Sequence, residues 1–236
     1  NYGAIVYSKT ALLFNYLMNY MGEEDFDVAM QFYFEQHKLK HPTEKDLRKV
    51  LEYFSEKKLD WFFDDLLGTA KKLDYRIVRY SMDPNDGTYM VEVKSVGDVK
   101  GPVPLCATKD GKIIGMVWYS GFEGSKVLEF PPSEVDAFTI DYFSFMPEVN
   151  RKNNILKKRG LFKKAEPLQL KFIASLDDPK KTQAFFAPVA AFNMYNGFML
   201  GAAYYNHTFF EKKFETEIMP MYSFGDNGVT GIANVC

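Results

Sequence analysis

Two histidines four positions apart are the first residues whose spacing could bind a metal ion. On one continuous helix, His37 and His41 would share a face, as the two histidines of a zinc-binding helix do. That signature also needs a glutamate directly after the first histidine, but position 38 is Lys. Pro42 further disfavours a helix that runs through both histidines. We therefore predict that they lie at a helix end or in a loop and bind no metal.

A second group of oxygen-bearing side chains could bind calcium. Asp83, Asn85 and Asp86 stand together beside Gly87. The twelve-residue loop of a calcium-binding hand, with its terminal glutamate, is missing here. Asp, Asn and Gly are also the residues that tight turns prefer. We predict a turn between two strands at this position.

Residues 151–164 contain seven basic side chains and no acidic one. A solvated linker explains them. A basic collar beside an anionic bilayer also does, since each Lys or Arg there contributes about 1 kcal/mol. A third interpretation is nucleic-acid binding, but Phe162 is the only aromatic residue interleaved with the basic ones, and the net charge of the chain is −2. We therefore expect no nucleic acid partner.

Helices must position the residues of the first part of the chain, residues 1–70. Apolar residues recur at intervals of three and four up to Met21, which predicts an amphipathic helix that ends at Gly22. A second apolar stripe starts at Phe26, and a third helix follows a capping box formed by Thr43 and Asp46. A short fourth helix is expected from Trp61 on. These four helices can share one core.

The same part of the chain resembles a known family over residues 4–66. The resemblance lies in the segment VYSKTALLFNYLMNYMGEEDFDVAMQFYFEQH and continues to the Asp-Trp-Phe-Phe sequence at 60–63. It is similar to the helical region downstream of the zinc site in the aminopeptidase N family of gluzincin metallopeptidases. Tyr7 and Lys9 match the Y-x-K positions of that family. Thr10 departs from its usual glycine, and Ser8 stands where glutamate is frequent.

This resemblance implies a catalytic role for Tyr7. A protonated phenol, with a reference pKa of about 10, can donate a hydrogen bond to the oxyanion that forms when water attacks a peptide carbonyl. It also implies a peptide substrate and a zinc ion in the parent protein. The family's zinc-binding helix and its Gly-x-Met-Glu-Asn segment do not occur among the 236 residues. We expect them upstream of Asn1, and we expect this chain alone to bind no zinc and to be inactive.

The pattern changes to short β-rich runs over residues 74–150. Turn sequences separate them, including those at 83–87, 96–98 and 109–111. Strands are expected near 75–80, 88–94, 103–108, 113–119, 126–130 and 137–142. About seven short strands at this spacing are typical of an immunoglobulin-like β-sandwich. Small β modules also follow the helical region in relatives of aminopeptidase N, so the resemblance implies the same order.

Residues 168–236 alternate between apolar and polar side chains, after a basic linker at 151–167. The alternation is clearest at 168–176 and 213–218. A half-buried soluble sheet produces this pattern, and so do the strands of an outer-membrane barrel. The residues at 188–201 and 220–223 resemble the carboxy-terminal barrel fused to aminopeptidase-like proteins of Bacteroidetes-type bacteria. That resemblance implies the start of an antiparallel, barrel-like domain, with further strands after residue 236.

Bulk composition sets weaker bounds. The chain is 47% hydrophobic and 17% aromatic, which fits a protein that buries a core and is rich in strands. Cys106 and Cys236 are its only cysteines, so they offer no disulfide framework. Asn stands at position 1 instead of Met, and we expect the natural start to lie further upstream.

Together these patterns predict an α+β protein in which a helical bundle piece, an immunoglobulin-like β-sandwich and an incomplete antiparallel, barrel-like segment follow one another. The leading hypothesis is a fragment of a membrane-anchored zinc aminopeptidase of the bacterial cell envelope, in the periplasm or outer membrane, with Tyr7 as its catalytic residue. The alternative is a non-catalytic envelope binding or scaffold module in which Tyr7 belongs to the core.

Overall fold

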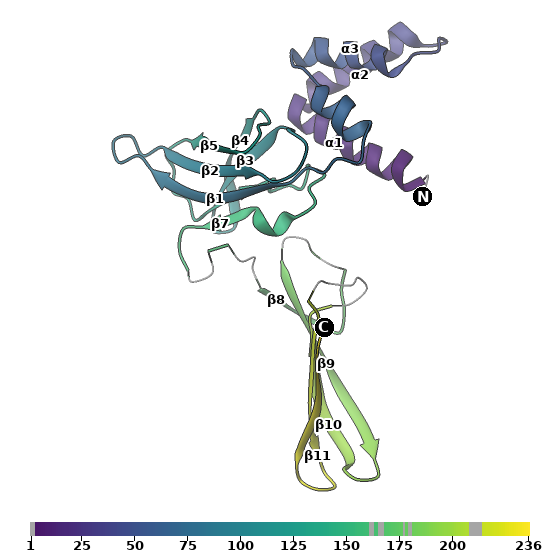
Figure 1. Cartoon of the computed structure of the whole chain (residues 1–236), viewed down its shortest axis with the longest axis vertical. Coiled ribbons are helices and arrows are strands. Elements are labelled where there is room, and N and C mark those ends of the chain that lie inside the picture. Colours follow the sequence, from purple (N-terminus) through teal and green to yellow (C-terminus); the bar gives the residue numbers. More distant parts are fainter. Residues whose placement is uncertain (1–2, 161–162, 165–167, 177, 179–180, 208–213) are drawn as a thin grey trace. The chain divides into compact units, whose positions relative to one another are not determined.

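The computed structural model describes residues 3–160, 163–164, 168–176, 178, 181–207 and 214–236. The chain divides into two compact units (Figure 1), which we call unit 1, Asn1–Lys164, and unit 2, Ala165–Cys236. Unit 1 contains the helices and two β-sheets, and unit 2 contains one β-sheet. The predicted α+β class is confirmed.

Unit 1 begins with helices, as the apolar spacing predicts. In chain order they are the π-helical turn η1 (Ala4–Lys9), α1 (Thr10–Met21), α2 (Glu23–His37), α3 (Glu44–Ser55) and the second π-helical turn η2 (Trp61–Leu67). Gly22 ends α1 with a φ of 102°, a conformation that glycine adopts without steric cost. At the start of α3 the predicted capping box is present, since Thr43 N donates to Asp46 Oδ2 over 2.8 Å.

Seven strands of unit 1 form two sheets. Their bounds are β1 (Tyr75–Met82), β2 (Tyr89–Ser95), β3 (Val103–Lys109), β4 (Lys112–Tyr119), β5 (Ser125–Phe130), β6 (Ala137–Ile140) and β7 (Ile155–Lys157). The strand orders are β1-β2-β5 and β4-β3-β6-β7, and all strand pairs are antiparallel. Strand β7 and the short helix η3 (Arg151–Asn153) lie within the stretch expected to be a linker. That stretch is therefore partly structured, because β7 pairs with β6.

The two sheets pack against each other around aromatic side chains. Phe138 on β6 contacts Phe130 and Tyr89 of the other sheet, with ring centroids 5.8 and 5.1 Å apart. Strand β3 lies between β4 and β6 and is almost entirely buried. The helices share the same core, because Tyr16 on α1 packs against Trp61 and Trp118 at 5.0 and 6.1 Å. Helices and sandwich in unit 1 are thus one packed body.

Unit 2 is a single sheet of five strands. They are β8 (Leu168–Phe172), β9 (Thr182–Asn193), β10 (Gly197–Tyr205), β11 (Thr216–Ser223) and β12 (Val229–Val235), in the order β12-β11-β10-β9-β8. Strands β9 to β12 form the predicted antiparallel succession of neighbours. The prediction was wrong for β8, which pairs parallel to β9. Among the described residues this sheet is open, and β8 and β12 are its end strands.

Two connections account for the difference at β8. The chain between β9 and β10 turns within three residues, which brings the strands back antiparallel. Between β8 and β9 the connection covers residues 173–181, and β9 then runs parallel to β8. Among the described residues, no helix is both long and apolar enough to cross a bilayer.

Candidate functional site

Tyr7, the residue predicted to be catalytic, lies on the π-helical turn η1 at the start of unit 1. Its side chain is 71% exposed, and that of its neighbour Val6 is 38% exposed. A tyrosine that served only to fill the core would be buried, as Tyr16 is nine residues later. The structure therefore places Tyr7 on the surface, where its phenol can reach a group outside this chain.

Contacts made by residues that follow Tyr7 hold the turn that carries it. Lys9 Nζ donates a hydrogen bond to the carbonyl oxygen of Thr69 over 2.7 Å, which ties η1 to the residues that follow η2. Thr10 N donates to the carbonyl oxygen of Tyr7 itself. Further along, Phe14 packs edge-on against Phe62, with ring centroids 5.2 Å apart. The backbone of Tyr7 is thus attached to a buried core, although its side chain is not.

Tyr16 shows the structural role that Tyr7 lacks. Its side chain is fully buried, and its hydroxyl donates to the carbonyl oxygen of Pro102, directly before β3 of the sandwich. Burial raises the pKa of Tyr16 well above its ordinary value, and Tyr75 and Asp141 add to the effect. Tyr75 makes a similar bond, from its hydroxyl to the carbonyl oxygen of Gly101 over 2.8 Å. Tyr16 thus joins α1 to the segment before β3, and Tyr75 binds the same segment from β1.

The chemistry open to Tyr7 is hydrogen-bond donation. An exposed phenol hydroxyl on a fixed turn can donate a hydrogen bond to a negatively charged oxygen. Lys9 faces the Thr69 carbonyl, so its ammonium has an anchoring role in this structure. The two residues of the Y-x-K pair therefore differ. The side chain of Tyr7 is exposed, whereas the ammonium of Lys9 binds the carbonyl oxygen of Thr69.

The histidine pair does not form a metal site. Helix α2 ends at His37, so His41 lies beyond it, and the ring of His37 packs against Tyr33 at 5.0 Å. Within the part of the chain that the structure describes, no three His, Cys, Asp or Glu residues lie close enough to hold a metal ion. The described residues therefore do not fit a zinc ion, and we assign no chemical step to zinc within this chain.

The acidic turn at 83–87 binds its own backbone, as predicted. Asp83 Oδ1 accepts from Asn85 N over 2.8 Å, and Asp86 Oδ1 accepts from Thr88 N over 2.8 Å. The bond from the backbone of Thr88 lowers the pKa of Asp86. Gly87 takes a φ of 76° within the turn. These carboxylates stabilise the connection between β1 and β2.

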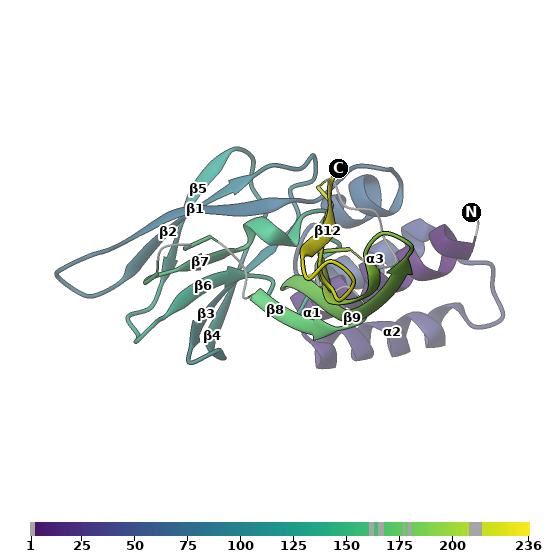
Figure 2. The same ribbon diagram turned by 90° about the horizontal axis from the view of Figure 1, so that it is seen from below.

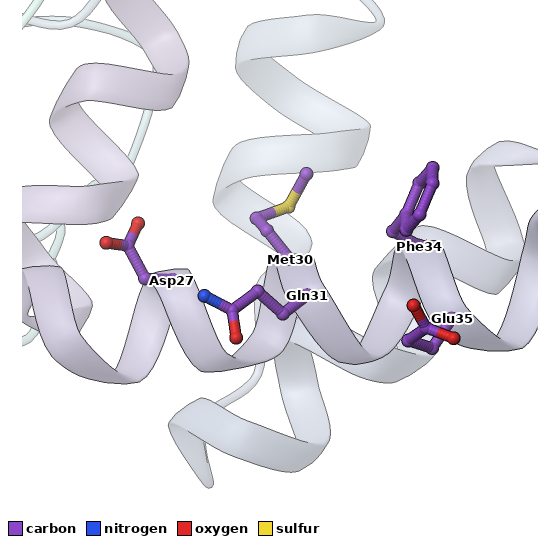
Figure 3. A pocket seen from close by; sticks show the side chains of 5 residues that line it. All are labelled: Asp27, Met30, Gln31, Phe34 and Glu35. Carbon is purple, nitrogen blue, oxygen red and sulfur yellow. The ribbon is translucent and has the colours of Figure 1, made fainter.

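A surface hollow of 520 Å³ lies on α2, and the described residues that line it all belong to that helix. Figure 3 shows Met30 and Phe34 pointing to the same side of the helix, with Asp27, Gln31 and Glu35 around them. Tyr7 is not among the lining residues. Phe34 is 63% exposed, so the hollow is an open surface with an apolar floor and an acidic rim.

Unit 1 contains a buried polar cluster that the sequence patterns do not predict. Glu148 accepts hydrogen bonds from Tyr75 N over 2.7 Å and from the side-chain amide of Asn154. Nearby, Asp141 accepts from Arg151 Nη1 over 2.7 Å and from two backbone amides. The cluster holds the chain that leaves β6 against the start of β1, where Leu73 and Glu148 form an isolated bridge. Asp141, Glu148, Arg151 and Asn154 lie close together in the sequence, but no known motif marks them, and Tyr75 reaches them only through the fold.

Burial dominates the electrostatics of this cluster. It raises the pKa of Glu148 to about 8, while the hydrogen bonds from Asn154 and Tyr75 act in the opposite direction. The pKa of Asp141 is also raised by burial, although Arg151 lowers it. The side-chain oxygen of Asn154 is buried without a hydrogen-bond partner. These groups lie inside unit 1 and have a structural role.

Comparison with known proteins identifies the helical region. Residues 1–66 match the family described as "Peptidase family M1 domain", so this segment is of the peptidase M1 type, like aminopeptidase N. The matched range includes η1 with Tyr7, the three α-helices and most of η2. The resemblance inferred from the sequence is confirmed at this level.

One solved structure similar to this chain is aminopeptidase A of Legionella pneumophila, determined in complex with aspartic acid. The two share 17% sequence identity at a TM-score of 0.47, over 58% of this chain. The matched region spans 16% of the length of that aminopeptidase. No curated protein matches the chain.

Proposed function

We propose that this chain is part of a zinc-dependent aminopeptidase of peptidase family M1, which hydrolyses amino-terminal residues from peptides. The match of residues 1–66 to the family is the observation that carries the proposal. The Y-x-K positions at Tyr7 and Lys9 support it, because they fall inside that segment. On this proposal the chain alone is inactive, and the zinc ligands belong to another part of the parent protein.

Tyr7 then acts as an electrostatic catalyst. When water adds to the scissile carbonyl, the carbonyl oxygen becomes an oxyanion, and the phenol donates a hydrogen bond to it. In this role Tyr7 stabilises the developing charge by donating a hydrogen bond and does not act as a base. The 71% exposure of its side chain fits a residue that completes a site formed with other parts of the protein.

Exposed apolar side chains on the helices support the same proposal. Among the described side chains of η1, α1 and α2, Val6, Leu12, Val28, Phe32 and Phe34 are 38% to 63% exposed. Where exposed apolar residues form a contiguous patch, they mark contact with another protein part. The remainder of a catalytic domain would cover them.

The proposal extends to the rest of the chain. The strand orders of the two sheets of unit 1 support an immunoglobulin-like sandwich next to the catalytic part. The antiparallel succession from β9 to β12 supports the start of an envelope barrel. We place the parent protein in the bacterial cell envelope, at the periplasm or outer membrane.

The test uses the natural gene product that contains this chain. Its zinc content and its release of chromogenic groups from amino-acid anilides are measured on the purified protein. The proposal predicts bound zinc and turnover that a chelator abolishes and added zinc restores. A parent protein with neither zinc nor turnover would contradict the proposal and favour the scaffold alternative. Fractionation of the producing cells tests the envelope location separately.

A further inference from the structure

The sheet of unit 2 has two faces of very different composition. The register places one set of strand residues on a common side, which we call the outer face: Leu168, Leu170, Phe172, Thr182, Ala184, Phe186, Pro188, Ala190, Phe192, Phe198, Leu200, Ala202, Tyr204, Thr216, Ile218, Pro220, Tyr222, Val229, Gly231, Ala233 and Val235. No member of this set is charged. The opposite, inner face includes Lys171 and Glu217.

Exposure separates the two faces equally clearly. Of the large hydrophobic residues on the described strands of unit 2 that are exposed, Ile232 alone is on the inner face. The inner face contains the buried residues Phe185, Met199 and Met221. Seen nearly end-on, the strands follow a curve (Figure 2), and the burial pattern makes the inner face the concave side. The convex side of the sheet is thus apolar and uncovered.

Aromatic residues lie in two rows across the outer face. Near the hairpin turns, Phe198 pairs with Phe192 and stacks on Phe224 at 6.0 Å. Towards the other end, Tyr204 pairs with Phe186, whose ring meets Phe172 at 5.4 Å. The rows between them contain mainly small and aliphatic side chains: Pro188, Ala190, Leu200, Ala202, Pro220, Val229 and Gly231. Tyr222, which pairs with Leu200, is the aromatic exception and lies one row inside Phe198.

The two aromatic rows lie somewhat closer together than the full height of the apolar band of an outer-membrane protein. Phe198 and Tyr204 are six residues apart on β10, which corresponds to about 20 Å along an extended strand. The apolar band of outer-membrane proteins is about 25 Å tall and has aromatic residues at both borders. Leu168 and Leu170 extend the apolar surface on β8 beyond the second row.

We propose that the outer face of this sheet lies against the acyl chains of a lipid bilayer, with the two aromatic rows near its interfaces. This proposal rests on the envelope location proposed above and specifies which side chains meet lipid. A protein partner fits less well. Within unit 1, sheets that meet another sheet bury one apolar face and leave charged residues such as Glu92 and Lys94 on the other.

A matched pair of isoleucines allows a direct test. Ile218 on the outer face is 52% exposed, and Ile232 on the inner face is 54% exposed, one row away on the adjacent strand. In a Cys236→Ser background, Ile218→Cys and Ile232→Cys are each labelled with a fluorophore. The full chain is then mixed with phosphatidylcholine vesicles, with and without bromine atoms on the acyl chains. Vesicles are recovered by flotation.

The proposal predicts that the chain floats with the vesicles. It also predicts that brominated lipid quenches the label at position 218 at least about twofold more than the label at position 232. Equal quenching of the two labels would overturn it, as would a chain that stays in the aqueous fraction. Formation of a lipid-independent dimer that shields position 218, seen by sedimentation, would also overturn it and would identify a second copy as the occupant.

A charge placed in the middle of the band gives an independent measurement. Arginine at the bilayer midplane of a lipid-facing strand costs about 2–4 kcal/mol, so Leu200→Arg should lower vesicle partitioning about 30- to 1,000-fold. Ile232→Arg is the control, and we expect its partitioning to remain within about threefold of the parent chain. Equal effects of the two substitutions would contradict the assignment of the faces. Neither result depends on peptidase activity, so failure here leaves the aminopeptidase proposal intact.

Discussion

The two units use alternating strands for different surroundings. On β2 of unit 1, Tyr89, Val91 and Val93 point into the sandwich and are buried, while Glu92 and Lys94 lie on the other face. On β10 of unit 2, Met199 and Ala203 are buried, yet the other face consists of exposed apolar residues. A period of two therefore reveals that a strand has two faces, whereas the composition of the second face indicates what lies against it.

A similar contrast separates two tyrosines of unit 1. Tyr16 is buried and bonded to the backbone of the sandwich, whereas Tyr7 is exposed on a turn that is held by its neighbours. Both stand in a helical, aromatic-rich sequence. Their surroundings distinguish a structural phenol from one that is available for chemistry.

The largest difference in stability between the two units is expected when one phenylalanine in each unit is replaced by alanine. Phe138→Ala removes a fully buried ring at the centre of the sandwich and should destabilise unit 1 by about 3–5 kcal/mol. Phe198→Ala removes a ring that is 48% exposed and should change the stability of unit 2 in water by about 1 kcal/mol or less.

Different probes follow the two units. Trp61 and Trp118 are the only tryptophans and both lie in unit 1, so their fluorescence during urea unfolding reports on that unit. Amide hydrogen exchange of β9 to β11 reports on unit 2. A loss of unit 2 stability on Phe198→Ala as large as that of unit 1 on Phe138→Ala would show that the outer face is covered in solution.

The second effect concerns pH and is confined to unit 1. The pKa of Glu148 rises from an ordinary value of 4.5 to about 8 on folding, so folding favours its protonated form. Its contribution to stability is fully present below pH 4.5 and is lost as the pH rises through 8, with a total on the order of 5 kcal/mol. Glu148→Gln keeps the side chain neutral and should flatten this dependence.

The measurement is urea unfolding at pH 5 and pH 8, followed by tryptophan fluorescence at constant ionic strength. The difference in unfolding free energy between the two pH values should shrink in the Glu148→Gln variant. In that variant the new amide can also donate to the unpartnered oxygen of Asn154, provided the Asn154 amide turns over. An unchanged pH dependence would show that the Glu148 carboxyl is not buried as described.

The smallest effect is expected at the start of α3. Thr43→Ala removes the hydroxyl of the capping box and should destabilise unit 1 by about 1 kcal/mol. Ser133→Ala, in an exposed loop of the same unit, is the control and should have a smaller effect. Urea unfolding by tryptophan fluorescence is sufficient for both variants. If Thr43→Ala also changed hydrogen exchange in β9 to β11, the two units would not be independent.

Much of the fold follows from local sequence signals. Three features were predictable because each signal acts within a few residues. They are the helix end at Gly22, the capping box of Thr43 and Asp46, and the turn at 83–87. The parallel pairing of β8 was not, since strand direction depends on how a nine-residue connection runs. The Glu148 and Asp141 cluster was also not predictable, because its partners meet only after the sheets have formed.

The candidate site is predictable to a similar degree. Resemblance to the family singled out Tyr7, and folding physics explains only its position on a fixed, exposed turn. The exposure of Tyr7 could not be read from the sequence, because its aromatic neighbours Phe14 and Tyr16 pack inward from the same helical region.

The most direct test of the role proposed for Tyr7 is the activity of a parent protein that carries Tyr7→Phe. Removing one oxyanion donor costs about 2.7–4 kcal/mol, so kcat/KM for an amino-acid anilide should fall about 100- to 1,000-fold. Tyr53→Phe, at a tyrosine that is 75% exposed on α3, should leave kcat/KM within about twofold of the wild type. Wild-type turnover in the Tyr7→Phe protein would contradict the role given to Tyr7.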